Sequence, residues 1–504
     1  MATTQNIPRN NNFNIMILLC QCLGISNINS TPNISFSEGV MASICFFTVF
    51  HILIGIPLLY METVISQFTS RDCIDIWKIR PCFSHVGYIL ILWQIIILIN
   101  NHTETAFFMH YLFISFETPI PFSTCGPWSD NYCDVISYNY TVNKDCLRSY
   151  YPPSYCEKLF ATYPEYQYWR KSLVKHNDIF YITWKVCLAS ATICGLVYLC
   201  CFKRERSLRW VVYILVCYPI ITSALLLIGS VLQKGVINKY QEAFSLNYKD
   251  FFTKFRFSII IRRTVYNLGI GSGLAQNLSA NSSFRTPCLS NIVICVVICT
   301  VYNIITISTA AIMTCPYAYE LDDSPDAIIK APLSFIFEKV PRLLNRFDNP
   351  SLYLISTFSC FTVLGVCCNV LIFYNLLEVA STRCKTIEKY PAAWILSSIV
   401  LCYAFCSEIM YQYRKGKNYV SLYGVYSVIA IIGLLVVIFI MKVIRAALKN
   451  KLSKVFQLDP CWGPKSEILQ RSRAMFSAQA MTKEYIYRQY HLQAGIIARQ
   501  RKSN

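Results

Sequence analysis

Two polar stretches interrupt long apolar segments, and their residue types suit the binding of a small ion. The first reads LGISNINSTPN (Leu23–Asn33) and the second reads NLGIGSGLAQN (Asn267–Asn277). Gly and Pro at such positions unwind a helix and free backbone carbonyl and N–H groups inside the bilayer. Paired interruptions of this kind indicate a transporter site, and the alternative is a kinked helix or a loop between short spans.

Charged and titratable side chains inside apolar segments form a second group with chemical potential. Arg263, next to Arg262, lies in the apolar segment that the second stretch interrupts. An arginine inside a bilayer is costly enough to suggest a functional site. A cation that reaches the membrane surface along its own side chain is the alternative. His102 and Glu104 could bind a substrate amine or relay a proton, or they could be paired structural groups. No nucleophile–base–orienter set or metal motif appears in the sequence, so we do not expect an enzyme.

The composition places these residues in a membrane protein with many helical spans. The chain has 504 residues, of which 55% are hydrophobic and only 14% are charged, and its mean hydropathy is +0.40. A soluble chain carries about 25% charged residues, whereas a bilayer-spanning helix needs about 20 mostly apolar residues. The fold class is therefore an all-α polytopic membrane protein. We expect ten spans, at residues 14–36 (interrupted), 40–67, 86–116, 178–201, 208–232, 257–283 (interrupted by glycines), 290–314, 352–380, 391–412 and 420–446.

Lysine and arginine set the expected orientation of these spans, because cytoplasmic loops collect them. The loops after the second, fourth and eighth spans are basic, with Arg71, Lys78, Arg80, Lys203, Arg204, Arg206, Arg209, Arg383, Lys385 and Lys389. Together with the basic tail 447–504, they place both the N-terminus (1–13) and the tail in the cytoplasm, on either side of a transmembrane domain at 14–446. The net charge of +19 then indicates attraction to anionic lipid in the bilayer and no nucleic-acid partner. The first apolar run has no small-residue cleavage site, so no signal peptide is expected.

Residues 117–177 form the large extracellular loop of this topology. Cys125 and Cys133 lie eight positions apart and can form a disulfide, but Cys146 and Cys156 share the loop and leave the pairing open. The sequon at Asn139 is a candidate glycosylation site. Most of the other cysteines stand in spans, where we expect them to pack as small apolar residues.

The stretch GIPLLYMETVISQFTSRDCIDIWKIRPCFSHVGY (Gly55–Tyr88) carries a recognisable motif. It closely resembles the second span and first cytoplasmic loop of the sodium- and chloride-dependent neurotransmitter symporter family, the solute carrier 6 type. The spacings from Pro32 to Pro57 and from Leu268 to Cys288 match that family without a gap. CGPWSDNYC resembles the extracellular disulfide loop of the family, which favours the Cys125–Cys133 pairing, and DPCWGPKSE (Asp459–Glu467) resembles a tail motif. The resemblance covers residues 14–380 well, and the chain is identified as a divergent member.

The resemblance implies a LeuT-like fold, in which five plus five helices form an inverted repeat and helices one and six are broken. Substrate and sodium would bind between spans one, three, six and eight, and transport would proceed by alternating access. Family members normally have twelve spans. The ten spans expected here are the number that the inverted-repeat core needs.

The resemblance also implies candidate sodium ligands. The family binds sodium with an Asn at the break of span one, where this chain has Asn27. Asn267 replaces a span-six hydroxyl and could still ligate, whereas Cys299 replaces a span-seven Asn and is a poor ligand. At the second sodium site, side-chain ligands become the thiols of Cys367 and Cys368, and sodium prefers hard oxygen, so this site is expected to be weak or lost. With backbone carbonyls included, the sodium-binding candidates are Asn27, Cys22, Asn267, Cys299, Cys20, Leu23, Leu364, Cys367 and Cys368.

Chloride is the candidate second ion. The positions that match the family's chloride site are Tyr60, Arg263, Asn267 and Asn303. All four side chains can donate hydrogen bonds to an anion. Arg263 adds a fixed positive charge, which would either tighten anion binding or replace a sodium ion. Glu62 resembles a family glutamate that braces the unwound span six, so we expect a structural role for it.

The substrate-binding candidates are Gly24, Asn101, Tyr266, Gly269 and Gly271. Gly24 stands where amine transporters of the family have Asp and amino-acid transporters have Gly. A free amino acid brings its own carboxylate, so the resemblance favours an amino-acid-like substrate. Asn101 replaces the tyrosine that closes over the substrate, whereas Tyr266 keeps an aromatic lid. The arginine of the family's external gate is Ser30 here, so half of that gate is absent.

These observations predict sodium-coupled secondary active transport of an amino acid or related small amine across the plasma membrane, with chloride as a candidate second ion. The alternative is a transport-inactive member of the family that acts as a binding, sensing or accessory subunit. The thiols at the second sodium site and the missing gate residue favour that alternative.

Overall fold

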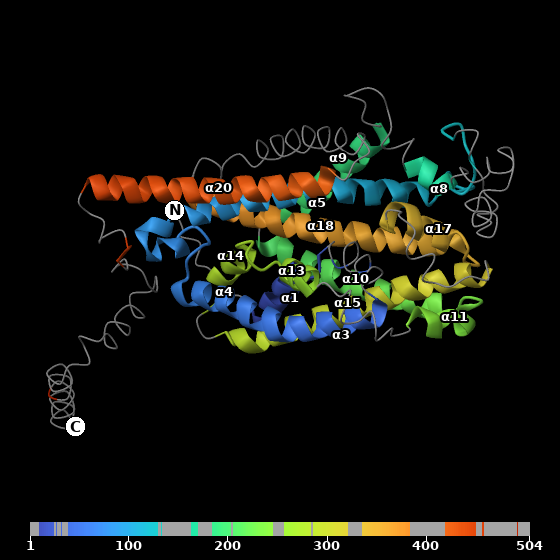
Figure 1. Cartoon of the computed structure of the whole chain (residues 1–504), viewed down its shortest axis with the longest axis horizontal. Helices are drawn as coiled ribbons and strands as arrows, with labels where there is room; N and C mark the ends of the chain where they lie inside the picture. The colour runs from blue at the N-terminus through green and yellow to red at the C-terminus, as the bar shows by residue number, and fades with distance from the viewer. Residues whose placement is uncertain are drawn as a thin grey trace, which may run out of the picture.

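The computed structural model of the chain describes residues 10–24, 27, 32, 39–129, 133, 163–169, 184–202, 205–244, 257–283, 286–320, 335–383, 419–449, 456–457 and 491. All regular elements in these residues are helices, most of which run side by side along the long axis of the molecule (Figure 1). The expected all-helical membrane fold is confirmed at this level.

The helices are α1 (Asn11–Cys22), α3 (Val40–Phe50), α4 (Ile56–Thr69), α5 (Val86–Ile114), α8 (Pro164–Gln167), α9 (Trp184–Cys201), α10 (Glu205–Val231), α11 (Val236–Ala243), α13 (Phe257–Asn267), α14 (Leu274–Ala280), α15 (Cys288–Glu320), α17 (Val340–Leu344), α18 (Pro350–Arg383) and α20 (Tyr419–Leu448). Short π-helical segments are η1 (His51–Gly55), which joins α3 to α4, and η6 (Phe335–Lys339). Short 3-10 segments are η2 (Ile76–Ile79) and η3 (Pro81–Phe83).

Several of the described helices are long and apolar enough to cross a bilayer. They are Val40–Thr69, Pro81–Ile114, Glu205–Val231, Cys288–Tyr319 and Pro350–Arg383. These five coincide with the second, third, fifth, seventh and eighth expected spans, and the shorter apolar helix Lys185–Cys201 coincides with the fourth. The expected span at 391–412 lies outside the described residues.

Several helices extend beyond the spans that hydropathy predicts, as the seventh and eighth spans show. The seventh was expected at 290–314, but α15 runs from Cys288 to Glu320, and the eighth was expected at 352–380, but α18 runs from Pro350 to Arg383. A hydropathy pattern ends where polar side chains begin. Backbone hydrogen bonding continues past that point, because water solvates the polar side chains of the last turns.

The helix α18 lies at the centre of the described bundle. In its most apolar window 72% of the residues are buried, against 33% in the corresponding windows of Pro81–Ile114 and Glu205–Val231. A helix that is apolar on all sides is one that neighbours surround. Gly365 makes the approach to α5 possible, since a Cβ at that position would collide with the side chain of Thr105.

The sixth span is broken as the glycines predict. The helix α13 ends at Asn267 and α14 begins at Leu274. Between them Gly269, Gly271 and Gly273 have φ values of 65°, 78° and 79°, in the left-handed region that only glycine adopts readily. Leu268, at the start of this break, packs on the second span at Gly55, where a Cβ would lie 2.5 Å from Leu268 Cδ1.

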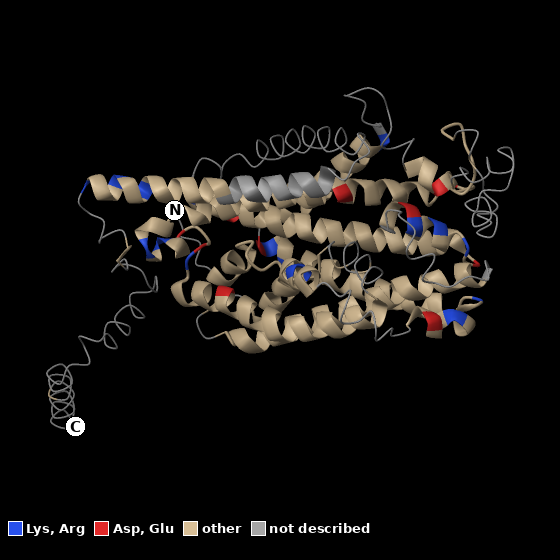
Figure 2. Ribbon diagram, viewed as in Figure 1, with Lys and Arg blue, Asp and Glu red and all other residues tan. Residues whose placement is uncertain are grey.

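One end of the bundle gathers the loop after α4 and the end of α18. The Arg383 guanidinium lies 3.2 Å from Asp72 Oδ2 and 3.1 Å from Asp75 Oδ1, and Lys442 Nζ donates to Ser84 Oγ at 2.7 Å. Two of the basic segments that were expected on one side of the membrane therefore meet. Figure 2 shows charged residues mainly toward the two ends of the helices, with a further basic segment at α13, midway along the bundle.

The opposite end holds α8, α11 and α17 (Figure 1). Asn345 Nδ2 donates to Glu165 Oε1 at 2.8 Å, and this links α17 to α8. Burial raises the pKa of the Glu165 carboxyl. Burial also lowers the pKa of Lys339, at the end of η6, from its usual 10.5 to about 8, against an opposing effect of Glu338.

Candidate functional site

The first interrupted segment begins where α1 ends. Leu23 closes the last turn of α1 by donating its N–H to Leu19 O at 2.8 Å, and Asn27 N–H bonds Gly24 O at 3.1 Å. Asn27 and Pro32 are described and buried. Residues 25–26, 28–31 and 33–38, including Ser30, lie outside the described residues.

The two polar atoms of the Asn27 carboxamide differ in their hydrogen bonding. Its Nδ2 donates to Cys22 O at 2.8 Å, and its side chain is fully buried. Its Oδ1 has no hydrogen-bond partner among the described residues. A buried carboxamide oxygen left without a donor is costly, and it is a suitable ligand for a hard cation. The geometry therefore fits the role that the sequence predicts for Asn27.

Cys299 on α15 faces the same turn of α1. Its Sγ lies 3.3 Å from Cys22 O and 4.0 Å from Asn27 Nδ2. The Cys22 carbonyl, one of the predicted sodium ligands, is thus occupied by Cys299 Sγ and by Asn27 Nδ2. The oxygen that stays open at this point is therefore the Oδ1 of Asn27.

The last turn of α1 meets the second interrupted segment through Gln21. Its Nε2 lies 3.2 Å from Leu268 O and 3.4 Å from Gly269 O, the first carbonyls of the break after α13. Sequence reasoning missed Gln21. The signal was a single amide side chain within the apolar run of α1, a position where a polar group needs a buried partner.

Two further contacts hold the break between α13 and α14 in place. Gly271 N–H donates to Glu62 Oε1 at 2.9 Å, so Glu62 braces this segment. Gln94 Nε2 donates to Ser272 O at 2.7 Å, and Asn375 Nδ2 donates to Gln94 Oε1 at 2.6 Å. The break is thus tied to α4, α5 and α18 as well as to α1.

The predicted chloride residues are not all brought together. Asn303 is buried on α15, and its Nδ2 lies 3.3 Å from His51 Nε2. Tyr60 is nine residues beyond His51, about 13 Å further along the helix, and its side chain is 37% exposed. The assignment of Tyr60 to a chloride site therefore stays a prediction, with this side chain placed apart from Asn303. Asn267 is buried where α13 ends.

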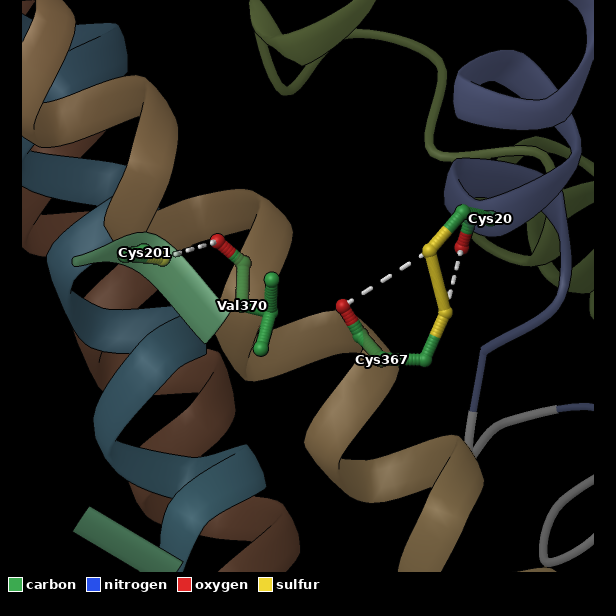
Figure 3. Close-up of a disulfide and its surroundings, with 4 residues drawn as sticks. All are labelled: Cys20, Cys201, Cys367 and Val370. Carbon is green, nitrogen blue, oxygen red and sulfur yellow. Dashed lines mark hydrogen bonds between the residues drawn. A yellow bond between two sulfur atoms is a disulfide. The ribbon is translucent and has the colours of Figure 1, made fainter. Parts of the chain in front are cut away.

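At the predicted second sodium site the structure has a cross-link instead of thiol ligands. Cys20 on α1 and Cys367 on α18 form a disulfide, with their Cα atoms 6.3 Å apart (Figure 3). Leu23 and Leu364 are fully buried beside it, and Cys368 is half-buried and outside the disulfide. Sequence reasoning expected Cys367 as a weak side-chain ligand. The disulfide corrects this, since its sulfur belongs to a covalent bond between α1 and α18.

The predicted substrate residues lie along α5 and around the break after α13. Asn101 Nδ2 is buried and has no hydrogen-bond partner among the described residues, whereas Tyr266 is 48% exposed. Arg263 is half-buried and lies within electrostatic reach of Tyr266 and of Glu104 on α5. His102 turns the other way, with Nε2 2.8 Å from Ser190 Oγ on α9. This contact fits the structural alternative for His102.

A separate cavity lies beside Pro32, with room of about 40 Å³ for water-sized molecules. Its walls are mostly apolar and include none of the predicted substrate residues. They come from α10, α15, α17 and α18, and contain Ser223, Leu226, Tyr302, Thr306, Thr357 and Phe361. We do not assign this cavity to the predicted substrate.

The loop after α5 contains the disulfide that the family motif favours. Cys125 and Cys133 are bonded, with their Cα atoms 5.9 Å apart. Asn139, Cys146 and Cys156 lie outside the described residues.

Comparison with known proteins gives several transporters as relatives. The human "Sodium- and chloride-dependent neutral and basic amino acid transporter B(0+)" is 24% identical over 319 residues, which cover 56% of this chain and 48% of that protein. The Xenopus laevis "Sodium- and chloride-dependent glycine transporter 1" is 23% identical over 284 residues, 54% of this chain and 44% of that protein. The Bos taurus "Sodium- and chloride-dependent creatine transporter 1" is 25% identical over 232 residues, 44% of this chain and 36% of that protein.

The chain therefore spans about half the length, or less, of these relatives. A family model matches a much larger part of this chain than these relatives do. The model described as "Sodium:neurotransmitter symporter family" matches residues 9–475. With this match over nearly the whole chain, the protein belongs to the sodium:neurotransmitter symporter family.

Proposed function

We propose that the protein carries out sodium-coupled secondary active transport of an amino acid or related small amine across the plasma membrane. One observation carries the proposal. The end of α1 and the break after α13 are joined by Gln21, and beside them the buried Asn27 Oδ1 has no partner among the described residues. The break after α13 and the buried side chain of Asn27 would supply the backbone and side-chain oxygens that a transported cation needs.

A LeuT-like inverted repeat is part of this proposal. Family membership, the break between α13 and α14 and the end of α1 at Cys22 support it. In such a fold a four-helix bundle that contains the broken helices rocks against a scaffold of the other helices. The ties from Glu62 and Gln94 to the break would fix its shape while the bundle moves.

The proposed substrate class follows from the residue at position 24. Gly24 offers no acidic side chain to a substrate amine and leaves room for a carboxylate. Amino acids, glycine and creatine, which the relatives are named for, all carry a carboxylate. The donors that could receive it include the buried Nδ2 of Asn101.

A second candidate function has its own support. The disulfide between Cys20 and Cys367 joins α1 to α18, and a rocking bundle needs these helices to move relative to each other. A protein fixed in this way would bind its solute without carrying it, as a sensing or accessory subunit does. Both functions require the protein to bind its solute, but only a transporter moves the solute across the membrane.

Uptake into oocytes that express the full chain separates them. Labelled neutral and basic amino acids, glycine and creatine are offered in sodium buffer and in choline buffer, with uninjected oocytes as the control. We expect saturable uptake of at least one solute that disappears in choline. Surface expression with sodium-dependent solute binding but no uptake would overturn transport and support the accessory function.

A further inference from the structure

Two buried carboxamides and a buried histidine form a group that the family motifs do not assign. Asn27 follows α1, His51 begins η1 in the second span, and Asn303 lies on α15. All three side chains are at most 1% exposed. The hydrogen bonds of this group determine which of its atoms face an ion.

The protonation of His51 follows from its two neighbours. His51 Nδ1 lies 2.6 Å from Phe47 O, and a carbonyl oxygen only accepts hydrogen bonds, so Nδ1 carries the proton. In the neutral ring, Nε2 is then an acceptor. Nε2 lies 3.3 Å from Asn303 Nδ2, so Asn303 donates to it.

This contact fixes the orientation of the Asn303 carboxamide. Its N–H end is turned toward His51, and its Oδ1 has no hydrogen-bond partner among the described residues. If the amide were flipped, its oxygen would face the lone pair of Nε2, and two acceptors repel each other. The contact with His51 therefore makes Oδ1 the Asn303 atom that has no hydrogen-bond partner among the described residues.

Asn27 is oriented in the same sense by a different partner. Its Nδ2 donates to Cys22 O at 2.8 Å, and its Oδ1 is open. Both carboxamides border one sulfur, since Cys299 Sγ lies 4.0 Å from Asn27 Nδ2 and 3.9 Å from Asn303 Nδ2. The group thus offers two buried acceptor oxygens, while its amide N–H ends are directed to protein partners. Acceptor oxygens bind a hard cation and repel an anion.

We propose that His51 is a positioning residue that holds Asn303 as an oxygen donor, so that the Asn27–Asn303 group binds sodium without the help of chloride. The inference deepens the proposed function, because it names the ion at that site and removes chloride as its partner. It predicts a difference from the relatives whose names include chloride dependence.

Ion binding to the purified full chain tests the inference without any need for transport. Thermal unfolding is measured in sodium chloride, sodium gluconate and choline chloride at constant ionic strength. A ligand that binds only the folded state raises the melting temperature in a saturable way. We expect equal rises in both sodium salts and none in choline chloride. A rise that requires chloride, or no rise in any salt, would overturn the inference.

Two variants of His51 separate positioning from packing. In His51→Gln the side chain can still donate to Phe47 O and accept from Asn303, so the half-saturating sodium concentration should stay near that of the wild type. In His51→Phe the acceptor is gone, and we expect that concentration to rise about tenfold, a difference of about 1.4 kcal/mol in binding free energy. Equal half-saturation in the two variants would contradict a positioning role.

Asn303→Leu covers the case in which His51→Phe does not fold. This change removes the oxygen directly and keeps the approximate volume, so the same rise in half-saturation is expected. A wild-type value in Asn303→Leu would overturn the inference. Sodium-dependent stabilisation in a protein that shows no uptake would count against transport and leave the inference standing, so the two failures are distinguishable.

Discussion

Gln21 Nε2 donates to Leu268 O at 3.2 Å, across 247 residues of sequence. This contact joins the last turn of α1 to the first residue of the break after α13. It makes the position of the last turn of α1 and the geometry of that break depend on each other. A change at Gln21 should therefore disturb both at once.

Gln21→Ala is expected to weaken the protein as well as its ion site. Loss of the amide leaves buried carbonyls without a donor, which costs about 1–3 kcal/mol. The melting temperature of the purified protein should fall, and its sodium half-saturation should rise. Gln241→Ala is the matched control, because Gln241 is exposed on α11 and should change neither quantity. If the two variants behave alike, Gln21 does not tie the segments together.

The cross-link between Cys20 and Cys367 gives a redox prediction. Cys367→Ser removes the bond, and loss of a native disulfide typically costs about 2–5 kcal/mol, so the melting temperature should fall. If α1 moves against α18 during transport, the same variant should show faster uptake than the oxidised wild type.

A membrane-permeant reductant should raise the uptake of the wild type to the rate of Cys367→Ser, and it should leave Cys367→Ser unchanged. Cys45→Ser is the control, since Cys45 is an exposed cysteine outside the disulfide. Peptide mapping that recovers Cys20 and Cys367 as alkylated thiols without reduction would contradict the cross-link itself.

Lys339 makes stability depend on pH at the end of the bundle near α17. Burial lowers its pKa to about 8, below its usual 10.5. Between these values the unfolded chain binds more protons than the folded chain, so the free energy of unfolding should rise as pH increases from 8 to 10.5. Lys339→Met should be more stable than the wild type below pH 8, and its advantage should shrink above that pH.

Thermal unfolding of both proteins between pH 7 and pH 10 measures this difference. Lys234→Met, at an exposed position, is the matched control with which Lys339→Met is compared at each pH. A constant difference between Lys339→Met and the wild type over this range would show that Lys339 does not titrate there.

The sequence predicts the break in span six well because its cause is local. Only glycine readily adopts the left-handed conformations found at Gly269, Gly271 and Gly273, so their spacing alone indicates an unwound segment. The family motifs likewise predict the brace from Glu62, which has a recognisable position in the second span. Local rules of this kind need no knowledge of how the helices pack.

The partners across helices could not be predicted in that way. His51 and Asn303 are 252 residues apart, and Cys20 and Cys367 are 347 apart, so their pairing depends on how helices turn against each other. Tyr60 illustrates what residue type alone leaves open. Its residue type suits an anion site, but its position on the helix turns it toward the exposed face. Residue type predicts what a side chain can bind, and helix phase decides whether it reaches the site.

The most direct test of sodium-coupled transport uses proteoliposomes that contain the full chain. A labelled solute that the oocyte screen identifies is placed at equal concentration on both sides, and a sodium gradient is then imposed. We predict that an inward sodium gradient drives solute accumulation and that an outward gradient drives its loss. Asn27→Ala should abolish both, whereas Asn238→Ala, at an exposed position on α11, should abolish neither. Solute that stays evenly distributed whatever the direction of the sodium gradient would contradict the account.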